Sequence, residues 1–127
     1  MWNNILVKVA EEKAVDMLKR DYFAHVDPDG EGINIKLYRA GYKLNPAFYE
    51  KPADNYFESI QGGVSDGVEM INDLIIDENE PNFGHRKHLL GIGDWNQNMT
   101  DIGIGMAKNP RSPLGVITVV IIAKHDF

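Results

Sequence analysis

Two of the four histidines in this sequence lie where an imidazole could do chemistry. His25 follows two aromatic residues at a junction between helical and turn-rich sequence, and His85 follows the segment Pro81-Asn82-Phe83-Gly84. Glu58 is the only acid in the run Tyr56-Phe57-Glu58-Ser59-Ile60, and a carboxylate in a buried strand needs a partner. Neutral imidazoles bind zinc, and such sites collect on loops held by a rigid scaffold. The sequence therefore predicts a polar cluster of His25, Glu58 and His85, contributed by three separate segments.

Each of these residues also has a plainer interpretation. His25 could be a structural histidine that donates to a loop carbonyl, and His85 could be a surface residue beside Arg86. Glu58 could point outward from an edge strand, which would leave no site. The cluster could also serve only to tie a sheet to its helices.

The two remaining histidines carry weaker signals. His88 follows His85 by three residues, so both could share one face of a helix, and His88 is a candidate extra ligand. The H-x-x-H spacing lacks the acid of a zinc-protease helix. His125 lies near the end of the chain, and we expect it to be solvated.

The acidic segments favour ordinary structure over a calcium site. The stretch 27–31, Asp-Pro-Asp-Gly-Glu, lacks the full spacing of a calcium-binding loop and predicts a turn. Asp77, Glu78 and Glu80 are interpreted mainly as a solvated helix end. Acids near a helix C-terminus are electrostatically unfavourable, which raises the chance of a metal or of a basic partner such as Arg86.

Hydrophobic periodicity predicts helices in the first part of the chain and strands in the last third. A helix capped by Asn3 or Asn4 precedes a second helix, and a third begins at Ser65 or Asp66. Helices first and strands last predict an α+β layered fold with a small antiparallel sheet. The expected helices are 3–20, 31–40, 65–76 and a short turn at 84–90; the expected strands are 56–61, 101–107 and 115–124; a long loop spans 42–55.

Length, composition and charge exclude several classes of protein. The chain has 127 residues, which is one domain, and a formal net charge of -6. That charge argues against nucleic acid and anionic membranes as partners. The absence of cysteine excludes disulfides and thiolate metal sites. No apolar run is long enough to span a bilayer, and no signal peptide is evident, so we expect a cytoplasmic protein or a mature or trimmed chain.

Several segments of the chain, in order, resemble motifs of the CAP superfamily, the SCP-like domains of cysteine-rich secretory, antigen 5 and pathogenesis-related-1 proteins. The resemblance is to a bacterial-type member and covers nearly the whole length. Residues 10–17 resemble the "A-x-x-x-A-x-x-M" helix, 23–30 the "F-x-H-x-x-x-x-G" segment, 57–60 "G-E-N-I", 84–90 "G-H-R-x-x-I-L", and 101–105 the "x-I-G-V-G" strand.

The resemblance implies one domain over residues 1–127, without the family's first N-terminal helix segment. It implies a three-layer α-β-α sandwich with a small central antiparallel sheet and a polar cleft. Carried over by motif, the cleft residues are His25, Glu58 and His85, and the two histidines would bind a divalent metal, with zinc expected. The second acid of the family's cleft would be Asp77 or Glu78.

The chain departs from the family pattern beside two of these residues. Phe57 and Ser59 replace the usual Gly and Asn around Glu58, which could alter how its carboxylate is held. His88 stands where bacterial members often have Asn, so a third imidazole could enter the cleft.

The family is not tied to one reaction, and its members are mostly exported. We therefore expect an extracytoplasmic, non-catalytic binding or effector module whose cleft holds a divalent metal. Its partner would be a small apolar, lipid or peptide ligand, or another protein. The alternative is a metal-assisted hydrolase, peptidase-like or esterase-like, with Glu58 as general base. A catalytic zinc usually has three protein ligands, so His88 or one of the acids 77–80 would have to supply the third.

Overall fold

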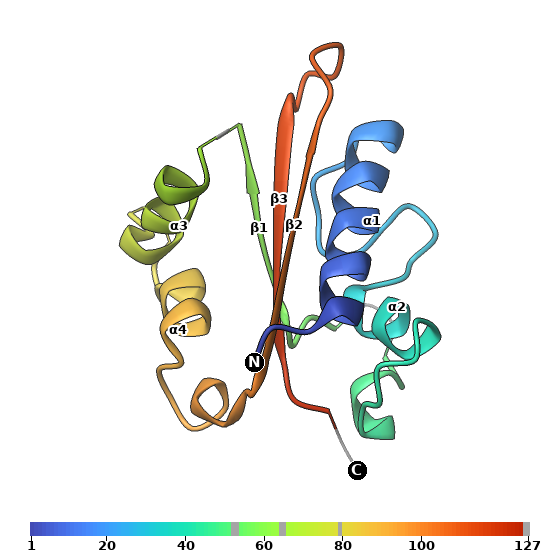
Figure 1. Cartoon of the computed structure of the whole chain (residues 1–127), viewed down its shortest axis with the longest axis vertical. Helices are drawn as coiled ribbons and strands as arrows, with labels where there is room; N and C mark the ends of the chain where they lie inside the picture. The colour runs from blue at the N-terminus through green and yellow to red at the C-terminus, as the bar shows by residue number, and fades with distance from the viewer. Residues whose placement is uncertain (52–53, 64–65, 79, 126–127) are drawn as a thin grey trace.

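In the computed structural model the chain forms three layers, with a small sheet between two groups of helices (Figure 1). The structure describes residues 1–51, 54–63, 66–78 and 80–125. Helices α1 (Asn4–Arg20) and α2 (Ile33–Arg39) cover one face of the sheet, and α3 (Gly67–Ile76) and α4 (Gly84–Leu90) cover the other. The expected α+β sandwich with a small antiparallel sheet is confirmed.

The sheet has three antiparallel strands in the order β1-β3-β2. The strands are β1 (Glu58–Gly62), β2 (Asp101–Lys108) and β3 (Val116–Ala123). β3 is central and is covered on both faces, which explains why its sequence is apolar apart from Thr118. Ile117, Val119 and Ile121 join the core under α1, whereas Val120 packs with Met70 and Leu74 of α3 on the other face.

Helix α1 packs directly onto β2 because β2 presents glycines to it. A Cβ atom at Gly103 would lie 2.4 Å from the backbone nitrogen of Val7, and one at Gly105 would lie 2.2 Å from that of Glu11. The glycine alternation in residues 101–107 therefore marks a close approach of two backbones. The side chain of Asn3 accepts hydrogen bonds from the first turn and fixes where α1 begins.

The layer on the other face of the sheet consists of α3 and α4, and a side chain caps the start of α3. Asp66 caps the start of α3 through the backbone N–H of Glu69, as one of the two expected alternatives, while Ser65 lies outside the described residues. Asp77 ends α3 in the left-handed conformation. The predicted helical turn at 84–90 is α4, a helix of seven residues.

The long segment between α2 and β1 is mostly irregular and is held by aromatic packing. It contains the short 3-10 helix η1 (Pro46–Phe48), and a second short helix, η2 (Asn96–Asn98), precedes β2. Phe48 contacts Trp95 with ring centroids 5.2 Å apart, and Phe57 stacks on the same indole at 5.9 Å. Within the described part of the chain, no helix is long and apolar enough to cross a membrane.

Candidate functional site

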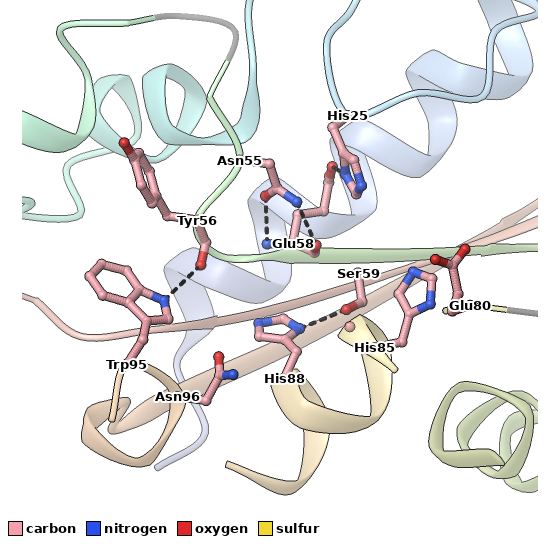
Figure 2. Close-up of a pocket in the computed structure, with 11 residues that line it drawn as sticks. His25, Asn55, Tyr56, Glu58, Ser59, Glu80, His85, His88, Trp95 and Asn96 are labelled. Carbon is pink, nitrogen blue, oxygen red and sulfur yellow. Dashed lines mark hydrogen bonds and ion pairs between the residues drawn. The ribbon is translucent and has the colours of Figure 1, made fainter. Parts of the chain in front are cut away.

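A polar cleft of about 550 Å³ opens at the outer edge of β1. Successive residues of a strand point to opposite faces of the sheet, so Glu58 faces the α1 layer and Ser59 faces α4. The cleft thus collects side chains from both helical layers, as Figure 2 shows on either side of the strand. The residues that matter for its chemistry are His25, Glu58, Glu80, His85, His88 and Trp95.

His25 is oriented by Glu58. The two side chains are joined by a hydrogen bond of 2.8 Å between Nδ1 and Oε1, although 33 residues separate them. Glu58 is 4% exposed and therefore faces inward, so the outward interpretation of this residue is wrong. The same Oε1 atom lies 3.5 Å from Nζ of Lys13, which also donates to the backbone carbonyl of His25 at 2.7 Å. Lys13 thus fixes both members of the pair from α1.

His85 is oriented in the same way by Asp77. Nδ1 of His85 lies 2.9 Å from Oδ1 of Asp77, while Oδ2 accepts from the backbone N–H groups of His85 and Arg86. Burial raises the pKa of Asp77, but these hydrogen bonds and the His85 charge outweigh it, and the pKa lies below its ordinary value. Asp77 is 5% exposed, so its assignment to a solvated helix end is wrong. The backbone of Asp77 is left-handed, and its carboxylate binds the N–H groups at the start of α4.

Within the described part of the chain, the side chain of Arg86 forms no ion pair with Asp77, Glu78 or Glu80. Its guanidinium donates instead to the carbonyls of Ile75 and Ile76, at 2.6 Å each, at the C-terminal end of α3. A cation there complements the helix dipole and satisfies carbonyls that have no partner within the helix. The basic partner of Asp77 is therefore the imidazole of His85 together with two backbone N–H groups.

The two hydrogen bonds fix which nitrogen of each imidazole is available. An ionised carboxylate only accepts, so Nδ1 carries the proton in both His25 and His85. In the neutral ring Nε2 then keeps a lone pair. Histidines that bind metal usually have this carboxylate on their other nitrogen, because it orients the ring and raises its basicity. A metal bound by either histidine would therefore be held through Nε2.

His88 is buried deeper than the other two. It is 8% exposed, and its Nδ1 lies 2.7 Å from Oγ of Ser59. Burial lowers the pKa of His88 to about 4, against the opposing effect of the backbone carbonyls of Ile122 and Phe57. The ring is therefore neutral at physiological pH. Its Nε2 atom is inaccessible and has no hydrogen-bond partner among the described residues. The pair connects β1 to α4 at the floor of the cleft.

The two remaining acids of this region are exposed. Glu80 lines the cleft beside His85, whereas Glu78 lines an adjoining hollow on the α3 side. Among the described residues, neither side chain is hydrogen-bonded to a histidine, which distinguishes them from Asp77 and Glu58.

Two expectations elsewhere in the chain have different outcomes. The carboxylate of Asp27 accepts from the backbone N–H groups of Asp29 and Glu31 and from Lys36, so the predicted turn is confirmed. His125 is not simply solvated, because its Nδ1 lies 2.7 Å from Oδ2 of the buried Asp101. That bond ties the end of β3 to the start of β2.

Sequence reasoning missed Lys13 and Trp95. Lys13 recurs with Ala10, Ala14 and Met17 on the apolar side of α1, and a lysine on such a face is the available signal of a buried cation. Trp95 is 40% exposed and lines the cleft, with its Nε1–H donating to the carbonyl of Tyr56 at 3.3 Å. No periodic pattern marks it, because it lies in a loop.

His25 and His85 are the cleft residues whose imidazoles would be left to hold a metal. Within the described residues, no group of three His, Asp or Glu side chains is gathered as a complete metal set. Glu58 and Asp77 are engaged in orienting the two imidazoles. A cation bound here would therefore take His25 and His85 and keep the rest of its coordination for water or a bound molecule.

Comparison with known proteins agrees with this architecture. The sequence model of the cysteine-rich secretory protein family, CAP, matches residues 1–122. The chain is similar to an extracellular protein containing an SCP domain from Bacillus anthracis str. Ames, with 26% identity and a TM-score of 0.64. The match covers 97% of this chain and 33% of that one, so the chain spans about a third of its length. No curated protein gives a significant match. The chain belongs to the CAP family of cysteine-rich secretory proteins.

Proposed function

We propose that this chain is an extracytoplasmic binding module whose cleft holds a divalent cation, zinc, through Nε2 of His25 and His85. The observation that supports it is the matched environment of the two imidazoles. Each has its Nδ1 on a buried carboxylate, Glu58 or Asp77, and the two rings come from opposite layers of the fold to one cleft. His125 has a similar bond to the buried Asp101 but does not line the cleft, so what distinguishes His25 and His85 is that both rings line one cleft.

The exported location is supported by family membership and by the structural neighbour, which is described as an extracellular protein. A cation bound by two imidazoles leaves coordination positions for a ligand. Zinc would act as a Lewis acid that anchors an oxygen or nitrogen atom of that ligand. The chain's own residues do the orienting: Glu58 and Asp77 hold the two rings, and Lys13 holds the backbone carbonyl of His25.

The geometry supports binding over metal-assisted hydrolysis. A hydrolytic zinc usually has three protein ligands, and no such trio is gathered within the described residues. The proposed general base, Glu58, is buried, with its Oε1 atom engaged by His25 and near Lys13. A general base must reach a water or substrate proton, so this position favours an orienting role for Glu58.

Histidine nitrogen chemical shifts measured during a zinc titration test the proposal. We expect the Nε2 resonances of His25 and His85 to move as zinc is added, while Nδ1 of each ring stays protonated. His125 serves as the internal control, because its Nδ1 is held by Asp101 outside the cleft. Shifts at neither of the two cleft histidines, or equal shifts at His125, would contradict the proposal.

A further inference from the structure

β1 leaves main-chain hydrogen-bonding groups open along its outer edge. The backbone N–H of Gly63 donates to Val116, and the carbonyl of Phe57 accepts from Ile122, so the odd-numbered residues of this segment pair with β3. Pairing alternates along an antiparallel strand. The N–H and C=O groups of Glu58, Ile60 and Gly62 therefore point away from β3.

Among the described residues, Glu58 is the one of these three whose outward groups have partners. The side chain of Asn55 accepts from the N–H of Glu58 at 3.0 Å and donates to its carbonyl at 3.0 Å, which ends the edge at that point. Within the described part of the chain, the outward groups of Ile60 and Gly62 have no such partner. Two residues of a strand span about 7 Å, which is the spacing at which the hydrogen-bonding positions of an added strand recur.

A groove accompanies this open edge. The cleft, which Glu58 and Ser59 line, shares Glu80 and His85 with a second hollow of about 410 Å³ that Gln61 lines further along β1. Figure 2 shows β1 crossing the site, with Trp95 at one end and Glu80 at the other. The groove therefore follows the strand, and its ends differ in chemistry.

Charge indicates what kind of chain the groove accepts. Asp73, Glu78 and Glu80 line its α3 end, and no lysine or arginine among the described residues lines either hollow. An acidic wall attracts a basic side chain. A second copy of this chain is a poor occupant, because each copy has a formal net charge of -6.

We propose that the groove binds an extended peptide, which adds as a strand to β1 and places a basic side chain at the acidic end. Main-chain pairing with Ile60 and Gly62 would supply affinity, and Glu80 with its acidic neighbours would supply selectivity. This assignment names the ligand class of the proposed binding module and rests on that function. Unlike the metal site, it needs no cation, so the two ideas can fail separately.

Selection of a random octapeptide phage library on the wild-type protein tests the proposal, with the bound peptides then synthesised and measured by fluorescence polarisation. We expect enrichment of peptides that carry Lys or Arg. N-methylation of alternate peptide nitrogens should weaken binding about tenfold at the paired positions and leave it unchanged at the others. The measurement is repeated with EDTA. Peptide binding to β1 should persist there, because it needs no cation, and this result does not depend on whether the protein binds zinc.

Gly62 offers a matched pair of variants. Gly62→Pro removes the outward N–H without touching the ladder to β3, since proline is tolerated on the open side of an edge strand, and it should weaken binding about tenfold. Gly62→Ala keeps the N–H, and its Cβ would meet Ile117 and Phe23 at ordinary contact distances of 3.5 Å, so it should bind as wild type. Glu80→Gln should weaken basic peptides selectively.

Three results would overturn the proposal. One is a library that yields no enriched peptide. Another is enriched peptides that are insensitive both to N-methylation and to Gly62→Pro in a folded variant. The third is a dimer in sedimentation that Gly62→Pro dissociates, because the open edge would then pair with a second copy of this chain.

Discussion

Lys13 of α1 lies 3.5 Å from the carboxylate of Glu58 on β1, and both side chains are completely buried. Burial lowers the pKa of Lys13, and the charge of Glu58 opposes that shift. The ammonium also donates to the carbonyl of His25, so one cation connects α1, the loop after it and the first strand. The cleft is thus built on a charged group inside the core.

Replacing Lys13 by methionine tests that arrangement. The variant Lys13→Met leaves the buried carboxylate of Glu58 without its cation, and breaking a buried pair from one side costs about 3 kcal/mol or more. Urea denaturation should show this loss in the free energy of unfolding. Lys19→Met, at an exposed position of the same helix, should leave it nearly unchanged. Equal stabilities for the two variants would rule out a supporting role for Lys13.

The contact between α1 and β2 gives a second prediction. Gly105→Ala places a Cβ 2.2 Å from a backbone nitrogen of α1, which cannot be relieved by moving a side chain. We expect a loss of about 3 kcal/mol or more in stability, or no folding at all. Gly67→Ala is the control, because nothing lies within 4 Å of its added Cβ and alanine favours the helix. Its melting temperature should be unchanged or slightly raised, and a similar loss in both variants would contradict the close approach.

His88 should make the fold sensitive to mild acid. Its pKa is lowered by burial from 6.5 to about 4, so folding favours the neutral ring. Stability from this group is fully present above pH 6.5 and is lost as the pH falls through 4, by about 3 kcal/mol in all. Urea denaturation between pH 7.5 and pH 4 checks this in wild type and in His88→Asn. The wild type should lose more stability than the variant over this interval, and parallel curves would refute the prediction.

Sequence reasoning recovered the elements whose patterns are long or unambiguous. The periodicity of α1, the alternation of glycine and isoleucine in β2 and the β-branched run of β3 all correspond to observed elements. The three residues assigned to the cluster, His25, Glu58 and His85, all line one cleft.

The rest depended on geometry that spacing does not reveal. The acidic neighbours of Asp77 favour a solvated helix end, whereas its carboxylate is bound to the backbone and ring of His85, eight residues further along the chain. Lys13 was not predicted as part of the site, since lysine is rarely buried. His125 lies two residues beyond β3, and its bond to Asp101 depends on how β3 pairs with β2. Each error concerns a polar residue whose partner is distant in sequence.

Calorimetric zinc titration near neutral pH, on wild type, the His25→Ala/His85→Ala variant and the control His125→Asn, tests the central claim most directly. We predict saturable binding in wild type and in the control, and none in the double variant, with circular dichroism showing all three folded. Wild-type zinc affinity in a folded double variant, or no zinc binding by the wild-type protein, would contradict the assignment of a metal to this cleft.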